Sequence, residues 1–380
     1  MANAFAIAAA ALMLKESEKQ HGDEMMHSLW VKKSDLAQSE WRESDAPSLA
    51  EGQILLEVQK YALTANNITY AVVGDGFGYW NFFPTGDDEW GIVPVWGFAK
   101  VVASENADIA VGERVYGYLP MASHLLVTPA NVQDGGFVDG AEHRQGLAII
   151  YNQYQRLGSD AGAHEAERAI FQPLFTTSFL IEHFMRSNDW FGAKALLMTS
   201  ASSKTSLALA MVARSLSPEI RRIGLTSAGN KAFVETSGLY DAVLTYDNLA
   251  EADTATPTVS VDFAGNSKLL GAIHSHWGDQ LKFSSLVGAT HISARGGGEE
   301  LQGPKPELFF APTAAESLMK EIGPVAFRER VDEQFSAFVS GASDYLQIED
   351  LKGRDALQSA YLSMLANEVD PSRGLMCHLA

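Results

Sequence analysis

The sequence predicts an α/β protein in which a β-rich first part is followed by a doubly wound parallel sheet. Three observations lead to this prediction. Short β-branched or aromatic runs separated by Gly and Pro dominate the first part of the chain. Beyond the middle, strand-like and helix-like runs alternate at the spacing of βα units. At Thr199–Ser206 a small polar turn joins an apolar strand to an Ala/Leu-rich helix, which is the arrangement of an anion site.

Length and composition limit the classes of function. The chain has 380 residues, enough for two domains with sizeable cores, and 46% hydrophobic residues, as in soluble globular proteins. Lys and Arg total 28 against 47 Asp and Glu, so the net charge is −19. Such a surface repels phosphate backbones and anionic membranes, and we expect no nucleic acid and no membrane partner. The single cysteine, Cys377, excludes an internal disulfide and thiolate zinc sites, and we expect no metal.

Residues 1–25 are interpreted as an N-terminal extension. The first fourteen are Ala-rich and apolar, but they lack the basic region of a secretory signal and are too short to span a bilayer. A frayed helix is the favoured interpretation, and a cleaved signal is the alternative. We expect the folded domain to begin near Met26 and the protein to be cytoplasmic.

Residues 26–150 are predicted to form a small, largely antiparallel β domain. The runs that predict its strands are Ile54–Leu63, Val95–Ala103, a short strand within Val111–Pro120, and His124–Thr128. Near residue 141 the pattern changes. Residues 145–156 and 163–184 have few helix breakers and are predicted to be helical.

Residues 151–305 are predicted to hold the parallel sheet, and residues 306–380 a C-terminal helical segment that returns to the first domain. The predicted strands are Lys194–Met198, Arg222–Leu225, Ala242–Thr245, Thr258–Asp262 and Phe283–Val287. Predicted helices between and after them are Thr205–Leu216, Lys231–Ser237, Ser267–His276, Ala315–Ile322, Val325–Phe338 and Arg354–Asn367.

Several short motifs resemble, in the same order, those of the medium-chain dehydrogenase/reductase superfamily, on its zinc-free quinone-oxidoreductase and enoyl-reductase side. They lie at Tyr61–Tyr70 with Gly74, Ile92–Val102, Gly112–Gly117, Pro173–Phe179, Leu196–Leu207 and Val261–Asn266. The resemblance implies a GroES-like β-rich domain, a Rossmann-type domain that binds NADP(H), and a homodimer. It spans about residues 48–292 and is weak beyond them.

The phosphate turn departs from the family at each glycine. Ser200, Ser203, Lys204 and Ser206 stand where the reductases usually have Gly. Serine is the smallest polar replacement, and hydroxyls of Ser203 and Thr205 suit a helix cap or a phosphate. A lysine at a helix start makes sense with an anion in front of it. The alternative is a decayed turn on a scaffold, with a solvated Lys204.

The next strand favours NADPH over NADH. An NAD site places an acid about 20 residues after the turn, but here none occurs before Glu235. Thr226, Ser227 and Lys231 would suit a 2′-phosphate. The alternative is a polar loop in which Lys231 is only a charge on the helix surface. The resemblance adds Tyr246 on the adenosine side, and Gly265 and Asn266 beside the nicotinamide.

The implied reaction is hydride delivery without a metal to enones, quinones or related carbonyls. Tyr70 is the candidate proton donor or oxyanion partner and Asn66 the group that polarises a carbonyl, although Tyr70 is also compatible with a packed aromatic. The aromatic loop Gly76–Pro84 suits a flat aromatic or lipophilic substrate, or fills the seam between domains. The competing hypothesis is a non-catalytic binding or assembly protein on a reductase scaffold.

Overall fold

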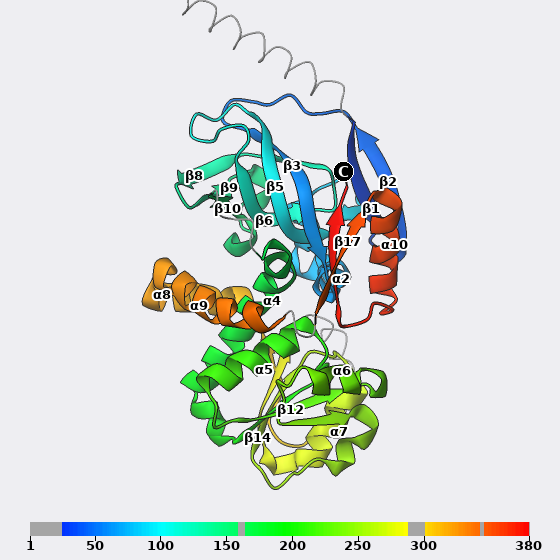
Figure 1. Cartoon of the computed structure of the whole chain (residues 1–380), viewed down its shortest axis with the longest axis vertical. Helices are drawn as coiled ribbons and strands as arrows, with labels where there is room; N and C mark the ends of the chain where they lie inside the picture. The colour runs from blue at the N-terminus through cyan, green and yellow to red at the C-terminus, as the bar shows by residue number, and fades with distance from the viewer. Residues whose placement is uncertain (1–24, 159–163, 288–300, 343–345, 380) are drawn as a thin grey trace, which may run out of the picture.

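The computed structural model describes residues 25–158, 164–287, 301–342 and 346–379. Figure 1 shows a β-rich body above and an α/β body below, with helices α4 (Glu165–Ser187) and α9 (Pro324–Ala342) between them. The fold class predicted from the sequence is confirmed.

The upper body is built on a nine-stranded sheet in which β7 pairs with β3 off the main path of β17-β18-β3-β5-β6-β10-β9-β8. A three-stranded sheet, β2-β1-β4, lies beside it. Gly97 in β5 crosses β3 closely, because a Cβ on it would lie 2.2 Å from the carbonyl oxygen of Lys60. The strands are β1 (Met26–Lys32), β2 (Asp35–Ser44), β3 (Ile54–Leu63), β4 (Trp90–Ile92), β5 (Pro94–Ser104), β6 (Arg114–Pro120), β7 (His124–Val127), β8 (Pro129–Gln133), β9 (Gly136–Asp139), β10 (Gln153–Leu157), β17 (Gln347–Lys352) and β18 (Arg373–His378).

The lower body is a six-stranded parallel sheet in the order β13-β12-β11-β14-β15-β16. Its first strand lies in the middle and the chain winds outward in both directions, which is the strand order of dinucleotide-binding folds. The strands are β11 (Ala195–Met198), β12 (Arg221–Thr226), β13 (Ala242–Thr245), β14 (Thr258–Asp262), β15 (Leu281–Val287) and β16 (Glu307–Phe309). The helices of this body are α5 (Lys204–Leu216), α6 (Lys231–Thr236) and α7 (Ser267–Trp277).

The helix predicted over residues 145–156 is wrong. Gly146 has a φ of 83°, which stops a right-handed helix, and only the short turn η3 (Ile149–Tyr151) follows. The chain then extends as β10 and pairs with β6 and β9. These pairings join segments distant in sequence, so they outweigh a local helical pattern.

The C-terminal segment contains helices α8 (Ala311–Ile322), α9 and α10 (Arg354–Leu365), close to the predicted ranges. It also contains β17 and β18, which the sequence analysis did not predict. β18 pairs antiparallel with β3, so the chain end lies in the upper body. The predicted domain limits stay predictions.

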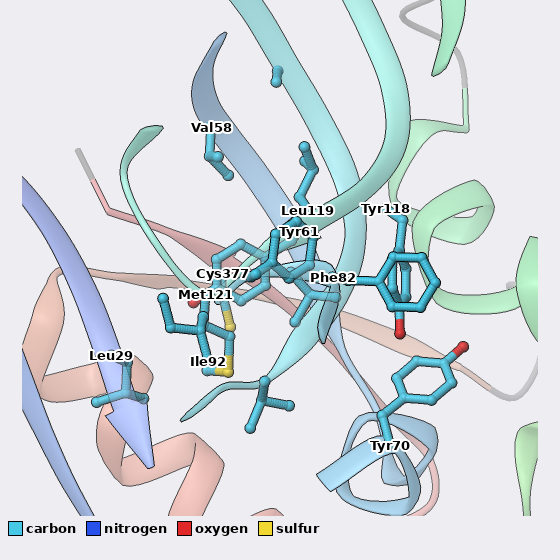
Figure 2. Close-up of a cluster of buried hydrophobic side chains, with 14 of the residues drawn as sticks. Leu29, Val58, Tyr61, Tyr70, Phe82, Ile92, Tyr118, Leu119, Met121 and Cys377 are labelled. Carbon is cyan, nitrogen blue, oxygen red and sulfur yellow. The ribbon is translucent and has the colours of Figure 1, made fainter. Parts of the chain in front are cut away.

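The upper body has a densely packed hydrophobic core. Figure 2 shows side chains from β1, β3, β6 and β18 meeting there, with Tyr61, Leu29 and Cys377 at 0% exposure. Tyr70 lies at the edge of this core, with its ring 5.4 Å from that of Tyr118 and nearly perpendicular to it. The aromatic side chains of the upper body therefore stand on a rigid base.

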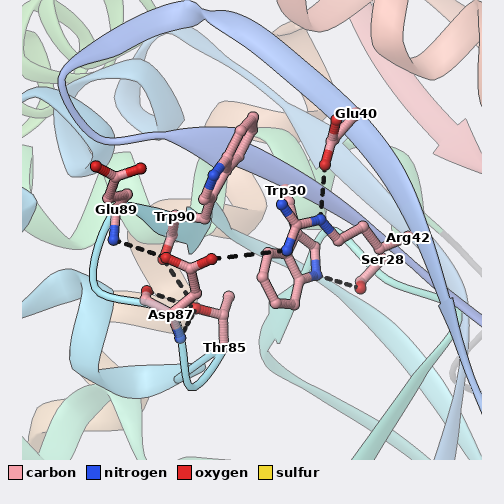
Figure 3. A network of polar contacts seen from close by, with 8 residues as sticks. All are labelled: Ser28, Trp30, Glu40, Arg42, Thr85, Asp87, Glu89 and Trp90. Atoms are coloured by element: carbon pink, nitrogen blue, oxygen red, sulfur yellow. Dashed lines mark hydrogen bonds and ion pairs between the residues drawn. The ribbon is translucent and has the colours of Figure 1, made fainter.

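The small sheet is held by one arginine between two indoles. The guanidinium carbon of Arg42 lies 3.9 Å from the ring centroid of Trp30 and 4.9 Å from that of Trp90 (Figure 3). Its Nε lies 2.7 Å from the Glu40 carboxylate. This cation–π sandwich ties β2 to β1 and β4.

Helix α4 begins at an acid clamped to the upper sheet. Glu165, 6% exposed, binds Lys60 of β3 at 2.6 Å and both terminal nitrogens of Arg114 of β6 at 2.8 and 3.2 Å. Burial raises the pKa of this carboxyl, but the bonds from Arg114 and Lys60 outweigh burial and hold it below the ordinary value of 4.5. This contact fixes the position of α4 relative to the sheet.

We expect Glu165→Gln to lower the free energy of unfolding at neutral pH by about 1.5–3 kcal/mol, because it removes charge-assisted bonds. A lowered carboxyl pKa gives stability that is complete above the ordinary value and lost as pH falls through the folded value. The gap between wild type and variant should therefore shrink below pH 4.5 in urea titrations. The exposed Glu51→Gln is the control, and a gap that stays constant with pH contradicts the assignment.

Candidate functional site

A cavity of about 770 Å³ opens beside α4, where the β-rich body meets the C-terminal helices. Its lining comes from the upper sheet, from α2 (Ala65–Val72), from one face of α4, and from α8 and α9. Thr205, in the first turn of α5, also lines it. The cavity therefore extends from the aromatic side chains of the upper body to the helix of the predicted phosphate turn.

Asn66 and Tyr70 both line this cavity, from the same helix. The neighbouring Asn67 has a different role: its Oδ1 accepts from the backbone N–H of Thr64 at 2.7 Å and its Nδ2 donates to the carbonyl of Pro94 at 2.9 Å. Asn67 thus caps α2 and ties it to β5, which leaves Asn66 to face the cavity. Of two adjacent asparagines, one supports the fold and one faces the cavity.

One wall of the cavity is aromatic. The indole Nε1 of Trp96 donates to the hydroxyl of Tyr70 over 3.2 Å. The rings of Trp96 and Tyr116 stack with centroids 5.9 Å apart and planes inclined by 26°. The hydroxyls of Tyr79 and Tyr151 share a hydrogen bond of 3.1 Å. A flat ligand can lie on these ring faces.

Burial keeps the tyrosines of the wall protonated. It raises the pKa of Tyr70 well above its ordinary value; the nearby Tyr79 raises it further, and hydrogen bonds with Trp96 and Asn66 partly oppose the rise. Burial also raises the pKa of Tyr116, whose hydroxyl has no hydrogen-bond partner among the described residues. The wall therefore presents neutral hydroxyl groups.

A buried ion pair supports the wall from behind. The Nε of Arg144 lies 3.0 Å from the carboxylate of Asp139, and both side chains are 1% exposed. Asp139 also accepts from the backbone N–H groups of Thr128 and Ala141, each at 3.1 Å. The guanidinium carbon lies 4.9 Å from the ring centroid of Phe83. Removing one partner would leave the other charge buried, at a cost of about 3–5 kcal/mol.

The aromatic loop Gly76–Pro84 divides between the cavity and the core. Phe77 and Tyr79 line the cavity. Trp80 packs so tightly that a Cβ on Gly74 or Gly91 would lie 2.1 or 2.4 Å from its ring. Phe82 and Phe83 are buried in the core. The loop therefore contributes both to the cavity lining and to the core of the upper body, rather than to a seam between domains.

The predicted phosphate turn keeps a glycine-like backbone without glycine. Ser200 has a φ of 46°, in the left-handed region that a glycine would adopt freely. The Ser203 side chain accepts from the backbone N–H of Ser206 at 3.2 Å and so caps α5. Within the turn, Ser200 thus adopts the backbone conformation typical of glycine, and the Ser203 hydroxyl caps the helix.

Lys204 does not point into the turn. Its ammonium donates to the backbone carbonyls of Pro371 and Arg373 at 2.7 and 3.0 Å. Burial lowers its pKa to about 8, although attraction to Asp370 opposes the shift. Lys204 therefore joins the helix start to the segment before β18, and the solvated alternative is wrong.

The residues predicted around the ribose and adenosine follow the ends of two adjacent strands, β12 and β13, and differ in exposure. Thr226 is buried, Ser227 is half-buried, and Lys231 lies 3.7 Å from Glu235 on the exposed surface of α6. The hydroxyl of Tyr246 accepts from the N–H of Ser200 at 3.3 Å. None of these four residues lines the cavity.

A hydrogen bond crosses from the loop after β12 to the phosphate turn: Asn230 Nδ2 donates to Ser202 Oγ at 3.0 Å. At the end of β14, Thr199 Oγ1 binds Asp262 and accepts from the N–H groups of Phe263 and Ala264. These bonds fix the two strand ends against each other.

Gly265 has a φ of 65° and is followed by Asn266, whose side chain accepts from the Leu269 N–H at 3.1 Å. This pair therefore turns the chain into α7 and caps that helix. Neither residue lines the cavity.

The structure thus brings Asn66, Tyr70 and Thr205 to one cavity and leaves the other predicted site residues outside its lining. Sequence analysis missed the polar end of the cavity, including Arg168 and Arg328. The sequence did contain a signal for Arg168: an arginine on the apolar face of a long helix is rarely buried unless another group binds it. Nothing in the sequence marks Arg328.

A family model described as "Protein of unknown function (DUF2855)" matches residues 61–370. The chain belongs to this family. No curated protein matches the sequence.

Solved structures match over nearly the whole chain. CurA from Vibrio vulnificus in complex with NADPH is 14% identical with a TM-score of 0.60, covering 90% of this chain and 94% of that one. A putative NADPH:quinone reductase from Mesorhizobium loti is 14% identical with a TM-score of 0.61, covering 93% and 98%. TarJ from S. aureus in complex with NADPH is 10% identical with a TM-score of 0.54, covering 94% and 100%. These matches confirm the predicted fold, a β-rich domain joined to a doubly wound parallel sheet.

Within the described part of the chain, every helix is too short or too polar to span a bilayer. The same residues contain no group of three or more His, Cys, Asp or Glu side chains arranged to hold a metal ion.

If Ser203 acts as the cap of α5, Ser203→Ala should lower the free energy of unfolding by about 1 kcal/mol, because the Ser206 N–H loses its acceptor. Ser203→Gly should cost only a few tenths, since glycine exposes that N–H to water. Urea denaturation of both variants measures the difference. Equal costs would show that the hydroxyl does not cap the helix.

Proposed function

We propose that this protein is an NADPH-dependent reductase that acts, without a metal, on flat enone, quinone or related carbonyl substrates. The cavity is the observation on which the proposal rests. Neutral tyrosine hydroxyls line one end of it, and the first turn of the helix after the phosphate turn lines the other part. Substrate and cofactor could therefore meet within one enclosed space.

The residues of the turn fit a nucleotide in two respects. The first N–H groups of α5 have no acceptor within the helix and form a donor set for phosphate. The left-handed Ser200 preserves the tight turn, and its neighbours are small. We propose that the backbone N–H groups of Lys204 and Thr205, at the start of α5, hold the pyrophosphate and that Ser227 and Lys231 lie nearest the ribose. Bound NADPH would supply a hydride.

The protein's own groups would bind and polarise the substrate. Tyr70 Oη accepts from Trp96, so this bond does not use the hydroxyl proton of Tyr70, which can be donated to another acceptor. Because burial raises the pKa of Tyr70, the hydroxyl stays protonated and suits hydrogen bonding to a substrate oxygen better than full proton release. Asn66 is the second donor from the same helix. The rings of the wall exclude water from this end.

Two observations favour the competing hypothesis of a non-catalytic binding or assembly protein. Lys204 is committed to carbonyls of the chain, and the Asn230–Ser202 bond spans the approach to the turn. A nucleotide would have to displace that bond.

The proposal also includes a homodimer, which the superfamily fold suggests, and a cytoplasmic location.

NADPH at about 100 times its dissociation constant should stabilise the fold by about 2.7 kcal/mol, measured as a thermal shift, and NADH should bind more weakly. Thr205→Glu should weaken NADPH binding at least about tenfold, because its carboxylate would face the phosphates. Thr205→Gln is the control of similar size without charge. The absence of any shift with NADPH would support the non-catalytic hypothesis.

Tyr70→Phe should lower kcat for reduction of menadione or benzylideneacetone by about 10²-fold, the usual effect of losing one oxyanion donor. NADPH absorbance measures the rate. Tyr61→Phe is the matched control, because Tyr61 is a buried tyrosine of the same core that does not line the cavity. Equal rates for wild type and Tyr70→Phe would remove Tyr70 from the reaction.

A further inference from the structure

The end of the cavity formed by α4 and α9 carries charge. Three charged side chains are among its lining residues: Arg168 of α4, and Arg328 and Asp332 of α9. The rest of the lining is aromatic, aliphatic or neutral polar. Two arginines and one aspartate give this end a net charge of about +1, in a chain whose net charge is −19.

Arg168 forms no direct ion pair among the described residues, although Asp332 of α9 attracts it from a longer distance. Its Nε donates to Gln172 at 2.7 Å and its Nη2 donates to Gln155, so both acceptors are neutral amides. Among the described residues no carboxylate lies within ion-pair distance of this guanidinium. These two hydrogen bonds to side-chain amides orient the guanidinium and leave three of its five N–H donors for other acceptors. A half-buried cation held in this way suits an anion that is not part of the chain.

The aromatic wall runs from Tyr70 to this guanidinium. Trp96 binds the hydroxyl of Tyr70 and stacks on Tyr116, and the guanidinium carbon of Arg168 lies 4.5 Å from the Tyr116 ring centroid. A flat molecule lying along Trp96 and Tyr116 would have a hydrogen-bond donor at one end and a cation at the other. Arg328 faces the same end from α9, where a Cβ on Gly135 would lie 3.9 Å from its Nη1.

We propose that the substrate is a flat carboxylic acid, with an enone or quinone carbonyl at the Tyr70 end and a carboxylate bound by Arg168, assisted by Arg328. The assignment of the carbonyl end rests on the proposed function, and the assignment of the carboxylate end does not. A monoanion matches the net charge of this end better than a phosphate dianion, because Asp332 offsets one of the two arginines. A carboxylate also matches the bidentate geometry of a guanidinium.

The test compares benzylideneacetone bearing a para-carboxylate with its methyl ester, two flat enones that share one skeleton and differ by the charge and one methyl group. Isothermal titration of the full chain without NADPH measures binding independently of any reaction. The acid should bind wild type about tenfold or more tighter than the ester. Arg168→Gln should abolish that preference, Arg168→Lys should retain part of it, and Arg328→Gln should reduce it. Arg214→Gln, on the exposed face of α5 and outside the cavity lining, should leave it unchanged.

Each outcome separates the two proposals. Equal binding of acid and ester to wild type, no binding of either, or an acid preference that survives Arg168→Gln would overturn the carboxylate site, whatever NADPH does. Arg328→Gln tests the same cation end without touching α4, should Arg168→Gln fail to fold. Tight, Arg168-dependent binding of the acid without NADPH oxidation would refute the reductase and leave the carboxylate site standing.

Discussion

The clamp on Glu165 is the contact from which the site is built. It anchors the first turn of α4 to β3 and β6, and every residue that α4 contributes to the cavity lies on the turns that follow. Arg168 stands one turn beyond the clamp, where the guanidinium reaches Tyr116 of the same strand that carries Arg114. The other end of α4 packs against α5, so one helix sets the distance between the aromatic wall and the phosphate turn. A rigid helix is the economical way to hold such a distance.

The phosphate turn shows how a nucleotide fold persists when its glycines are gone. Backbone shape is kept by a left-handed serine, and helix capping is kept by Ser203. Hydroxyl groups of Tyr240 and Tyr246 then brace the turn through Ala201 and Ser200. The Lys204 side chain adds no positive charge facing the turn, because its ammonium is bonded to the carbonyls of Pro371 and Arg373 at the start of β18. Any affinity for phosphate must therefore come mainly from backbone N–H groups and the helix dipole.

Sequence reasoning reached the fold because the fold follows from local patterns. The run of Ala195–Met198, its polar turn and the Ala-rich helix are contiguous, so their identity and order can be read directly. It failed where distant segments decide: β10 and β18 become strands because edges of the upper sheet are available to them. For the site, motif matching selected Asn66, Tyr70 and Thr205, which line one cavity, whereas it assigned Lys204 to an anion although its partners lie about 170 residues away. No local pattern encodes such a contact.

The distribution of charge in the cavity determines how a ligand would be oriented. Burial keeps Tyr70, Tyr116 and Tyr151 neutral, so the aromatic end can donate hydrogen bonds but cannot compete for an anion. The nearest buried cation behind that wall, Arg144, is already paired with Asp139 and contributes little net field. The cationic end of the cavity lies on α4 and α9, where Asp332 offsets one of the two arginines. A molecule with one carbonyl and one acidic group has a single favourable orientation between these two ends, with its carbonyl against Tyr70.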